Sequence, residues 1–277
     1  MDMKTVPGST AQAKSVLFAD NDLLLLEAVG DFLRASGFQV HLAQDGLQAL
    51  EMCRREKPNF VILDIVMPRI DGARVCWFLR QDPKLKDTPI IVFSSLSGQD
   101  FRNFPQLSAD AYVAKGPLPI SCENIIQAIR KIEGEGRQSA AAESGIIGYN
   151  HVRPRKMIQE MLDERRHYAN VLRALGAGVL ELDQNGRIAM ANPGACRFLK
   201  AKEAQLVGER LTSFIPMQDR KALQDLFAEF AKTTEPQRCR INVHLGDSSV
   251  PLQVCAIMEG KECESILVII EASEAGS

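Results

Sequence analysis

The chain has 277 residues, of which 45% are hydrophobic and 25% are charged, and its formal net charge is −2. This length suggests about two domains of ordinary globular composition. A nearly neutral chain argues against binding to nucleic acid or an anionic membrane, and its apolar runs fall far short of the roughly 18 residues of a membrane span. The polar start, MDMKTVPGSTAQAKS, lacks the apolar core of a signal peptide. We therefore expect a cytoplasmic protein.

The cysteines are scattered and include no C-x-x-C pair. This distribution predicts reduced thiols, and it argues against a zinc site or a disulfide framework. The seven residues are Cys53, Cys76, Cys122, Cys196, Cys239, Cys255 and Cys263.

Short apolar strands and helical segments alternate from residue 15 to about residue 133. Strands are expected at 15–19, 38–43, 59–63, 89–93 and 111–114, and helices at 21–37, 45–58, 72–81 and 119–132. Asp45 is a plausible N-cap, and Gly37 and Pro58 are helix stops. The helical pattern over 97–109 is weaker because Pro105 breaks it. The alternation predicts an α/β fold with a doubly wound, parallel, five-stranded sheet, as in flavodoxin.

Polar side chains follow four of these strands. Because the carboxyl ends of parallel strands share one edge of a sheet, these side chains should meet around one point. They are Asp20, Asn21 and Asp22, then Asp64, then Ser94 and Ser95, and finally Lys115. Carboxylates suit Mg²⁺, an ammonium and a hydroxyl can hold phosphoryl oxygens, and a carboxylate can accept a phosphoryl group. The alternative is that each residue only caps the end of its strand. In that case the meeting of carboxylates, a hydroxyl and an ammonium at one edge would need several independent coincidences.

Residues 14–134 resemble the receiver domain of bacterial two-component response regulators. The stretch LDIVMPRIDG, residues 63–72, is similar to the phosphoacceptor signature of that family. The resemblance implies that a histidine kinase or phosphotransfer protein phosphorylates Asp64, with Ser94 as the switch hydroxyl, Ser95 beside it, Lys115 pairing with the phosphate and Tyr112 following the switch. It also implies a Mg²⁺ site made by Asp20, Asn21, Asp64 and the carbonyl of Val66.

Two positions depart from the family pattern. Asn21 stands where the family has a second acid that binds the metal, so we expect weaker Mg²⁺ affinity, which Asp22 could offset although it falls one place late. Gly116 stands where the family has a proline, and Pro117 comes one residue later, so the loop that aims Lys115 is expected to be looser.

Residues 133–150 are rich in Gly, Ser and Ala, and we assign 135–164 to a flexible linker and the start of a helix. Apolar residues from Ile158 to Leu175 recur at three- and four-residue steps, which predicts an amphipathic helix over 155–175. We expect this stripe to form a homodimer by nearly coiled-coil packing over residues 155–175, with the PAS domain contributing. The alternative is that the stripe packs on its own domain.

Residues 165–277 resemble a PAS domain, an α+β fold on an antiparallel sheet. The resemblance rests on GVLELDQNGRIAMANPGACRFL at 178–199, AQLVGERLTSFIP at 204–216 and IIEASE at 269–274. PAS domains sense small ligands, hold haem or flavin, or dimerise. Cys196 is not at the position of a flavin-binding cysteine, and the helix at 217–232 lacks a haem-ligating histidine, so we expect no tightly bound cofactor. His167 and His244 are expected to be ordinary structural residues.

Together these observations predict a regulatory protein that is not an enzyme. A receiver would take a phosphoryl group and a PAS module would sense or dimerise. Two alternatives stay open: the chain could be the regulatory input part of a histidine kinase or cyclase, or it could be a phosphate-independent scaffold.

Overall fold

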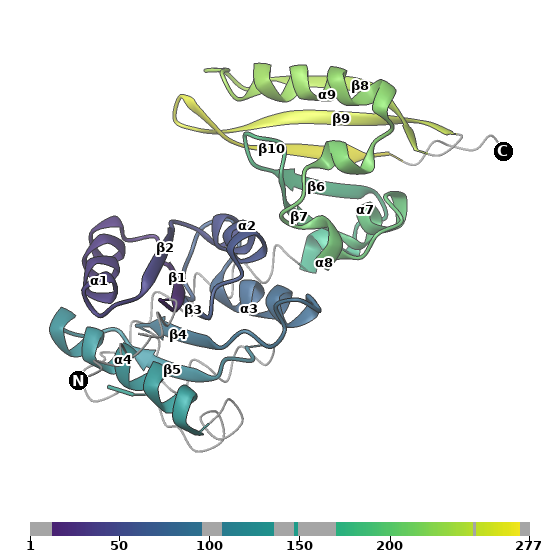
Figure 1. Cartoon of the computed structure of the whole chain (residues 1–277). Coiled ribbons are helices and arrows are strands. Elements are labelled where there is room, and N and C mark those ends of the chain that lie inside the picture. The colour runs from purple at the N-terminus through teal and green to yellow at the C-terminus, as the bar shows by residue number, and fades with distance from the viewer. Residues whose placement is uncertain (1–12, 96–106, 136–146, 149–169, 246–247, 272–277) are drawn as a thin grey trace, which may run out of the picture. The chain divides into compact units, whose positions relative to one another are not determined.

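The computed structural model describes residues 13–95, 107–135, 147–148, 170–245 and 248–271. The chain divides into two compact units, residues 1–153 and 154–277 (Figure 1). The weak helical pattern at 97–109 and most of the predicted linker and helix, with His167, lie outside the described residues.

The first unit is built on a five-stranded parallel sheet with the order β2-β1-β3-β4-β5. Figure 1 shows α1 and α4 on one face of this sheet and α2 and α3 on the other. The strands are β1 (Ser15–Ala19), β2 (Gln39–Ala43), β3 (Phe60–Leu63), β4 (Ile90–Ser94) and β5 (Ala111–Ala114). The predicted doubly wound fold is therefore confirmed.

Two residues of this unit have the capping positions that the sequence predicted. Asp45 caps α2 (Gly46–Glu56) by accepting a hydrogen bond from the backbone of Gln48. Gly37 follows α1 (Leu23–Ala35) with φ of +92°, a left-handed conformation that glycine adopts without strain. The remaining helices are α3 (Gly72–Gln81) and α4 (Leu118–Glu135).

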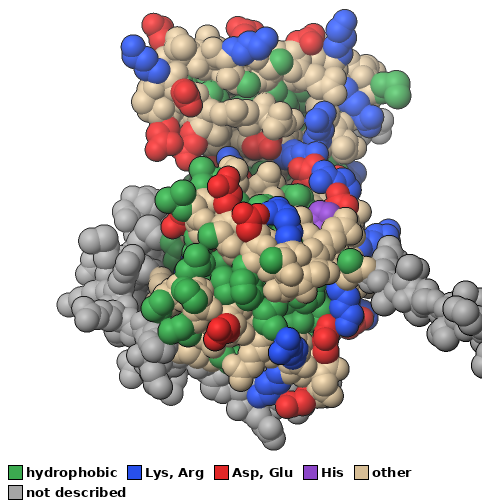
Figure 2. Space-filling view, turned by 60° about the vertical axis from the view of Figure 1, so that its left-hand side comes forward, with side chains coloured by type: hydrophobic (Ala, Val, Ile, Leu, Met, Phe, Trp, Pro, Cys, Tyr) green, Lys and Arg blue, Asp and Glu red, His purple; other side chains and the backbone are tan. Residues whose placement is uncertain are grey.

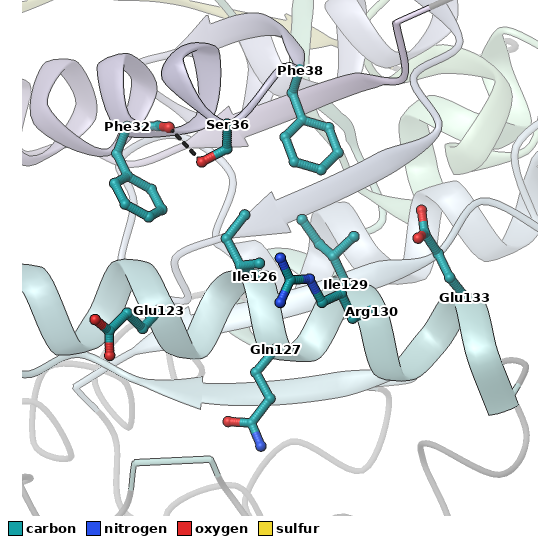
Figure 3. A pocket seen from close by; sticks show the side chains of 9 residues that line it. All are labelled: Phe32, Ser36, Phe38, Glu123, Ile126, Gln127, Ile129, Arg130 and Glu133. Carbon is teal, nitrogen blue, oxygen red and sulfur yellow. Dashed lines mark hydrogen bonds between the residues drawn. The ribbon is translucent and has the colours of Figure 1, made fainter. Parts of the chain in front are cut away.

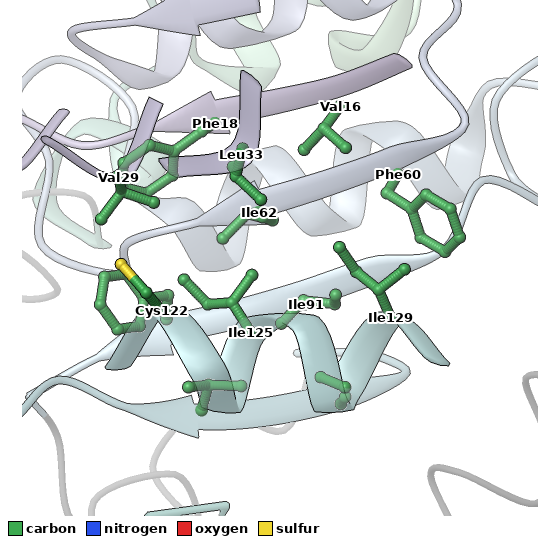
Figure 4. Packing of buried hydrophobic residues seen from close by; sticks show 14 of the residues in the cluster. Val16, Phe18, Val29, Leu33, Phe60, Ile62, Ile91, Cys122, Ile125 and Ile129 are labelled. Atoms are coloured by element: carbon green, nitrogen blue, oxygen red, sulfur yellow. The ribbon is translucent and has the colours of Figure 1, made fainter. Parts of the chain in front are cut away.

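One hydrophobic core lies between the sheet and the helices α1 and α4. Figure 4 shows Cys122, Ile125 and Ile129 of α4 facing the strand residues Phe18 and Ile62. These side chains are at most 2% exposed, so the sheet face beneath α4 is fully covered. A strand buried in this way holds the residue at its end in a fixed position, which prepares the carboxyl edge for a site.

The second unit carries a five-stranded antiparallel sheet with the order β7-β6-β10-β9-β8. Its strands are β6 (Gly178–Leu182), β7 (Ile188–Ala191), β8 (Arg238–Leu245), β9 (Ser248–Glu259) and β10 (Glu262–Ile270). Between β7 and β8 lie α7 (Pro193–Phe198), α8 (Glu203–Leu206), a 3₁₀ turn (Leu211–Phe214) and α9 (Met217–Phe230). The arrangement of two strands, helices and three strands confirms the predicted α+β fold.

Asn192 joins several parts of this second unit. Its side-chain oxygen accepts hydrogen bonds from the backbone of Val179 and Ala195, each at 2.8 Å. Its amide nitrogen donates to the carbonyls of Leu172 and Ala177, at 3.0 and 2.9 Å. Since the residue is 2% exposed and fully satisfied, it fixes β6, α7 and the helical residues 170–174 to one another.

All seven cysteines are free thiols in the structure. None of the helices within the described ranges is long and apolar enough to cross a membrane.

Candidate functional site

Backbone pairing continues one residue beyond β1, β3 and β5 and so includes three predicted site residues. The amide of Asp20 donates to the carbonyl of Ala43, that of Asp64 to Ala19, and that of Lys115 to Ser94, at 2.9 to 3.1 Å. The sheet register therefore continues through these residues, and it brings β1, β3, β4 and β5 to a common edge as expected.

The ammonium of Lys115 lies between two carboxylates. Its Nζ atom is 2.7 Å from Asp20 Oδ2 and 2.8 Å from Asp64 Oδ2. Asp20 is fully buried, Asp64 is 4% exposed, and the Lys115 side chain is 18% exposed. Carboxylates this close repel one another unless a cation lies between them, and here Lys115 supplies that cation.

The ionisation of these groups reflects a competition between burial and charge. Burial raises the pKa of Asp20, the nearby Lys115 charge opposes this, and the charge of Asp64 adds to the rise. Burial alone would lower the pKa of Lys115, but the charges of Asp64 and Asp20 outweigh it and hold that pKa above its usual range. The lysine therefore stays charged between its carboxylate partners.

Ser94 contributes a hydroxyl to the same edge. It is fully buried, and its Oγ atom has no hydrogen-bond partner within the described part of the chain. A buried hydroxyl without a partner is costly, which is common at sites that are completed by a ligand. Tyr112 instead donates its hydroxyl to the carbonyl of Leu107, at 3.3 Å. Ser95 follows β4 and is partly exposed.

The loop after β3 passes very close to Asp64. A Cβ atom on Gly72 would lie 2.0 Å from the carbonyl oxygen of Asp64, so only glycine fits there. The Gly72 amide donates to the carbonyl of Ile65, and Asp64 Oδ1 accepts from the Ile65 amide at 2.7 Å. The Asp-Gly pair of the signature thus turns the chain back over the predicted phosphoacceptor.

The donor set at this edge fits Mg²⁺, although it is sparse. Asp20 and Asp64 supply two carboxylates, Val66 is partly exposed on the adjoining loop, and Asn21 is exposed at the site's rim. No group of three or more acidic, histidine or cysteine side chains among the described residues could hold a metal ion. Mg²⁺ needs only one or two carboxylates, because it retains water ligands.

Asp22, next to Asn21, caps the first helix. Its Oδ1 atom accepts hydrogen bonds from the amides of Leu24 and Leu25, at 3.0 and 3.2 Å, so the carboxylate caps α1. Asp22 therefore has the ordinary structural role of an N-cap.

The loop after Lys115 is anchored, which differs from the looseness expected at Gly116. The Gly116 amide donates to Ser121 Oγ at 2.9 Å, and the buried Ser121 amide donates to the carbonyl of Pro117. The hydroxyl of Ser121, on the first turn of α4, thus restricts the backbone at Gly116, the position where the family has a proline. The small polar residue three or four places into a helix was the signal that our sequence analysis missed.

Sequence analysis also missed the contacts that brace the signature loop from α2. Arg69 adopts φ of +61° and pairs with the carboxylate of Asp45, which is 4% exposed. A Cβ atom on Gly46 would lie 1.9 Å from the carbonyl oxygen of Ile70, so the α2 N-terminus and this loop are in direct backbone contact. Such pairings join residues 24 positions apart, and no local pattern indicates them.

Comparison with known proteins identifies both units. Residues 16–130 match the response regulator receiver domain, and residues 166–271 match the PAS fold. The chain therefore contains a receiver domain followed by a PAS domain. This confirms the domain types that the sequence predicted.

The receiver domain has many relatives among response regulators. It is 33% identical over 136 residues to response regulator MprA of Mycobacterium leprae, a match that covers 49% of this chain and 58% of that protein. It is 28% identical over 123 residues to polar-differentiation response regulator DivK of Brucella anthropi. That match covers 44% of this chain and 98% of DivK. The chain thus spans little more than half the length of MprA.

Among solved structures, the chemotaxis response regulator CheY4 of Vibrio cholerae is 22% identical to this chain. The match covers 42% of this chain and 98% of CheY4, with a TM-score of 0.40.

A groove of about 610 Å³ lies elsewhere on the receiver domain, between α1 and α4. Figure 3 shows Phe32 and Phe38 on one side of it and Ile126 and Arg130 of α4 on the other. Hydrophobic side chains gather on the receiver face that is turned forward in Figure 2. None of the predicted site residues lines the groove, so it is separate from the carboxyl edge.

In the PAS domain, His244 of β8 has a structural partner. Its ring Nδ1 atom is 3.0 Å from Asp219 Oδ2 of α9, and its amide donates to the same oxygen at 2.7 Å. These contacts hold the pKa of Asp219 below its usual range.

Cys196 lies on α7 and is partly exposed, and burial raises the pKa of its thiol. A second groove, of about 490 Å³, lies between the Gln184–Gly186 turn and Phe227 of α9.

Proposed function

We propose that this protein acts in a phosphorelay, with Asp64 of the receiver domain accepting a phosphoryl group from a histidine kinase or phosphotransfer protein. The observation that carries the proposal is the group of Asp20, Asp64 and Lys115 within ion-pair distance, together with the buried hydroxyl of Ser94 at the same edge, which has no hydrogen-bond partner among the described residues. A structural salt bridge would explain the charges, but it would not explain a hydroxyl that lacks a partner.

The proposed reaction joins an Asp64 carboxylate oxygen to the phosphorus atom of the donor. The bond from phosphorus to the donor's histidine nitrogen breaks, and the imidazole leaves with the bonding electron pair, so an aspartyl phosphate forms. Lys115 balances the negative charge of the product, and Ser94 can donate a hydrogen bond to one of its oxygens. Mg²⁺ held by Asp20, Asp64, Asn21 and the Val66 carbonyl would neutralise phosphoryl oxygens when it is bound.

On this proposal the protein is a cytoplasmic regulator and not itself an enzyme. The PAS domain would sense a ligand or contribute to a homodimer together with residues 155–175.

The test is phosphorylation of the purified chain by acetyl phosphate with Mg²⁺, followed by intact mass. We expect the wild type to gain one phosphoryl group and the Asp64→Asn variant to gain none. The matched control is Asp219→Asn, which removes a carboxylate of the PAS domain that pairs with His244 and should label like the wild type. Labelling of Asp64→Asn at the wild-type level would refute the assignment, and an unlabelled wild type would favour the phosphate-independent scaffold.

A further inference from the structure

The exposed edge of the receiver sheet is occupied by a short segment from farther along the chain. β5 is an edge strand, so one side of its backbone has no neighbouring strand within the sheet. Ile147 pairs with this side in a parallel bridge to Val113. Its amide donates to the carbonyl of Tyr112 and its carbonyl accepts from the amide of Ala114, both at 2.9 Å. Two residues that we expected to belong to a flexible linker are therefore docked on β5 through a single β-bridge.

Side chains make this docking specific. Ile147 is partly buried and packs against the core that α4 and the sheet share. Gly148 adopts φ of +80°, and a Cβ atom there would lie 2.5 Å from the side-chain nitrogen of Asn124 on α4. The pair Ile147–Gly148 thus supplies an apolar anchor and then a residue that alone fits against α4 without strain. Unpaired strand edges invite pairing with other chains, and this segment covers part of one.

The docked segment lies next to the proposed phosphorylation site along the backbone. Ala114, which donates to Ile147, directly precedes Lys115, which pairs with Asp64 and Asp20. The Lys115 amide also donates to the carbonyl of Ser94. The backbone of Lys115 therefore lies one residue from the backbone that holds the segment.

We infer that docking of Ile147–Gly148 on β5 is energetically coupled to the state of the Asp64 site, so that the segment is a releasable cover of the β5 edge. This inference rests on the proposed function. In the structure Lys115 pairs with two carboxylates, and Ile147–Gly148 is docked on β5 in this same state. A phosphoryl group on Asp64 places new negative oxygens farther from the Asp64 backbone and draws the ammonium toward them. The end of β5 follows, so docking is weaker in the phosphorylated state.

Amide hydrogen exchange of the full chain tests the coupling, with beryllium fluoride and Mg²⁺ as a stable phosphoryl mimic. We expect the mimic to speed exchange at the Ala114 and Ile147 amides by about fivefold or more, since allosteric couplings are commonly of this size. The Val61 amide, which donates to Pro89 within the sheet, should not change and so controls for general unfolding. Fluorine NMR of the same sample shows whether the mimic is bound.

Coupling is reciprocal, so a variant that prevents docking should bind the mimic more tightly. Ile147→Pro removes the amide that donates to Tyr112, and Gly148→Ala introduces strain at a positive φ; both should tighten binding of the mimic by about fivefold or more. The matched control is Gly260→Ala, which replaces a glycine with φ of +62° that has no neighbour within 4 Å.

The outcomes separate the coupling from the proposed function. If the mimic binds and the exchange at Ala114 and Ile147 is unchanged, the coupling is wrong while the proposed function stands. If the mimic does not bind, the proposed function fails and the coupling is judged on Asp64→Asn, which removes a charged partner of Lys115. Faster exchange at Ala114 in that variant supports the coupling, and unchanged exchange overturns it.

Discussion

Lys115 Nζ lies 2.8 Å from Asp64 Oδ2, so the proposed phosphoacceptor is paired with a cation before any phosphoryl group arrives. The same ammonium is 2.7 Å from Asp20 Oδ2. One lysine therefore compensates two buried carboxylates, and a bound metal ion would have to share them with it.

This shared pairing predicts how Mg²⁺ affects stability. Replacing Lys115 with Ala leaves Asp20 and Asp64 without their cation, and loss of one member of a buried ion pair costs about 3–5 kcal/mol. Mg²⁺ should restore part of that loss, because a ligand that binds only the folded state stabilises it. We expect Mg²⁺ to raise the Tm of Lys115→Ala more than that of the wild type. Lys14→Ala, at an exposed ion pair with Glu133, is the control. An equal rise in all three proteins would contradict the prediction.

Asn21 predicts a weak metal site that a single substitution strengthens. Asn21→Asp adds a carboxylate at the rim of the site, and a unit charge about 4 Å from a cation contributes on the order of 1–4 kcal/mol. Calorimetric titration should therefore show Mg²⁺ binding tighter by about fivefold or more. Asp22→Asn serves as the control, because it removes a charge from the adjacent N-cap and should leave the affinity nearly unchanged. Affinities that are the same in Asn21→Asp and the wild type would show that residue 21 does not reach the metal.

Arg80 and Asp110 form a mostly buried ion pair outside the candidate site, and we expect its loss to destabilise the receiver domain. Its guanidinium is 2.7 Å from Asp110 Oδ2 and donates to the carbonyls of Lys86, Thr88 and Ser108. Since both side chains are mostly buried, we expect Arg80→Ala to lower the free energy of unfolding by about 3–5 kcal/mol in urea denaturation. The exposed pair of Arg34 and Asp31 provides the control, with less than about 1 kcal/mol for Arg34→Ala. Similar losses in the two variants would exclude a special role for Arg80.

In the PAS domain, we expect substitution of Asn192 to lower the free energy of unfolding. Asn192→Ala removes four hydrogen bonds and leaves buried backbone groups unsatisfied, which should cost about 1–3 kcal/mol. The measurement is thermal unfolding of the full chain, read at the transition of the PAS domain. Asn185→Ala, at an exposed turn position, should leave that transition in place. A transition unaffected by Asn192→Ala would mean that other contacts fix β6 to α7.

The predicted dimer through residues 155–175 and the PAS domain stays open. Within the described end of that helix, Leu172 is partly buried, and Val171 and Leu175 are 47% and 44% exposed. Exposed apolar side chains of this kind favour a partner, so Val171→Glu and Leu175→Glu should convert a dimer to a monomer in light scattering at tens of micromolar. Arg173→Glu on the same helix should not. A wild type that is monomeric at these concentrations would rule the dimer out.

Strand and helix positions, both fold types and the grouping of Asp20, Asp64, Ser94 and Lys115 at one edge were predictable from the sequence. These features follow from local rules: hydrophobic periodicity, capping residues such as Asp45, and the fact that parallel strands end on the same side. The prediction succeeded because each residue's position along its strand fixes its position in the sheet.

Only the tertiary structure decided how these residues are satisfied. It assigned Asp22 to the cap of α1, fixed the Gly116 loop through Ser121, and docked Ile147 on the edge of β5. Each of these outcomes depends on which donor or acceptor is left without a partner once the chain has folded, and hydrogen-bond groups of the same type compete for it. Local sequence patterns state which side chains are available, but the three-dimensional arrangement determines which of them are close enough to bind.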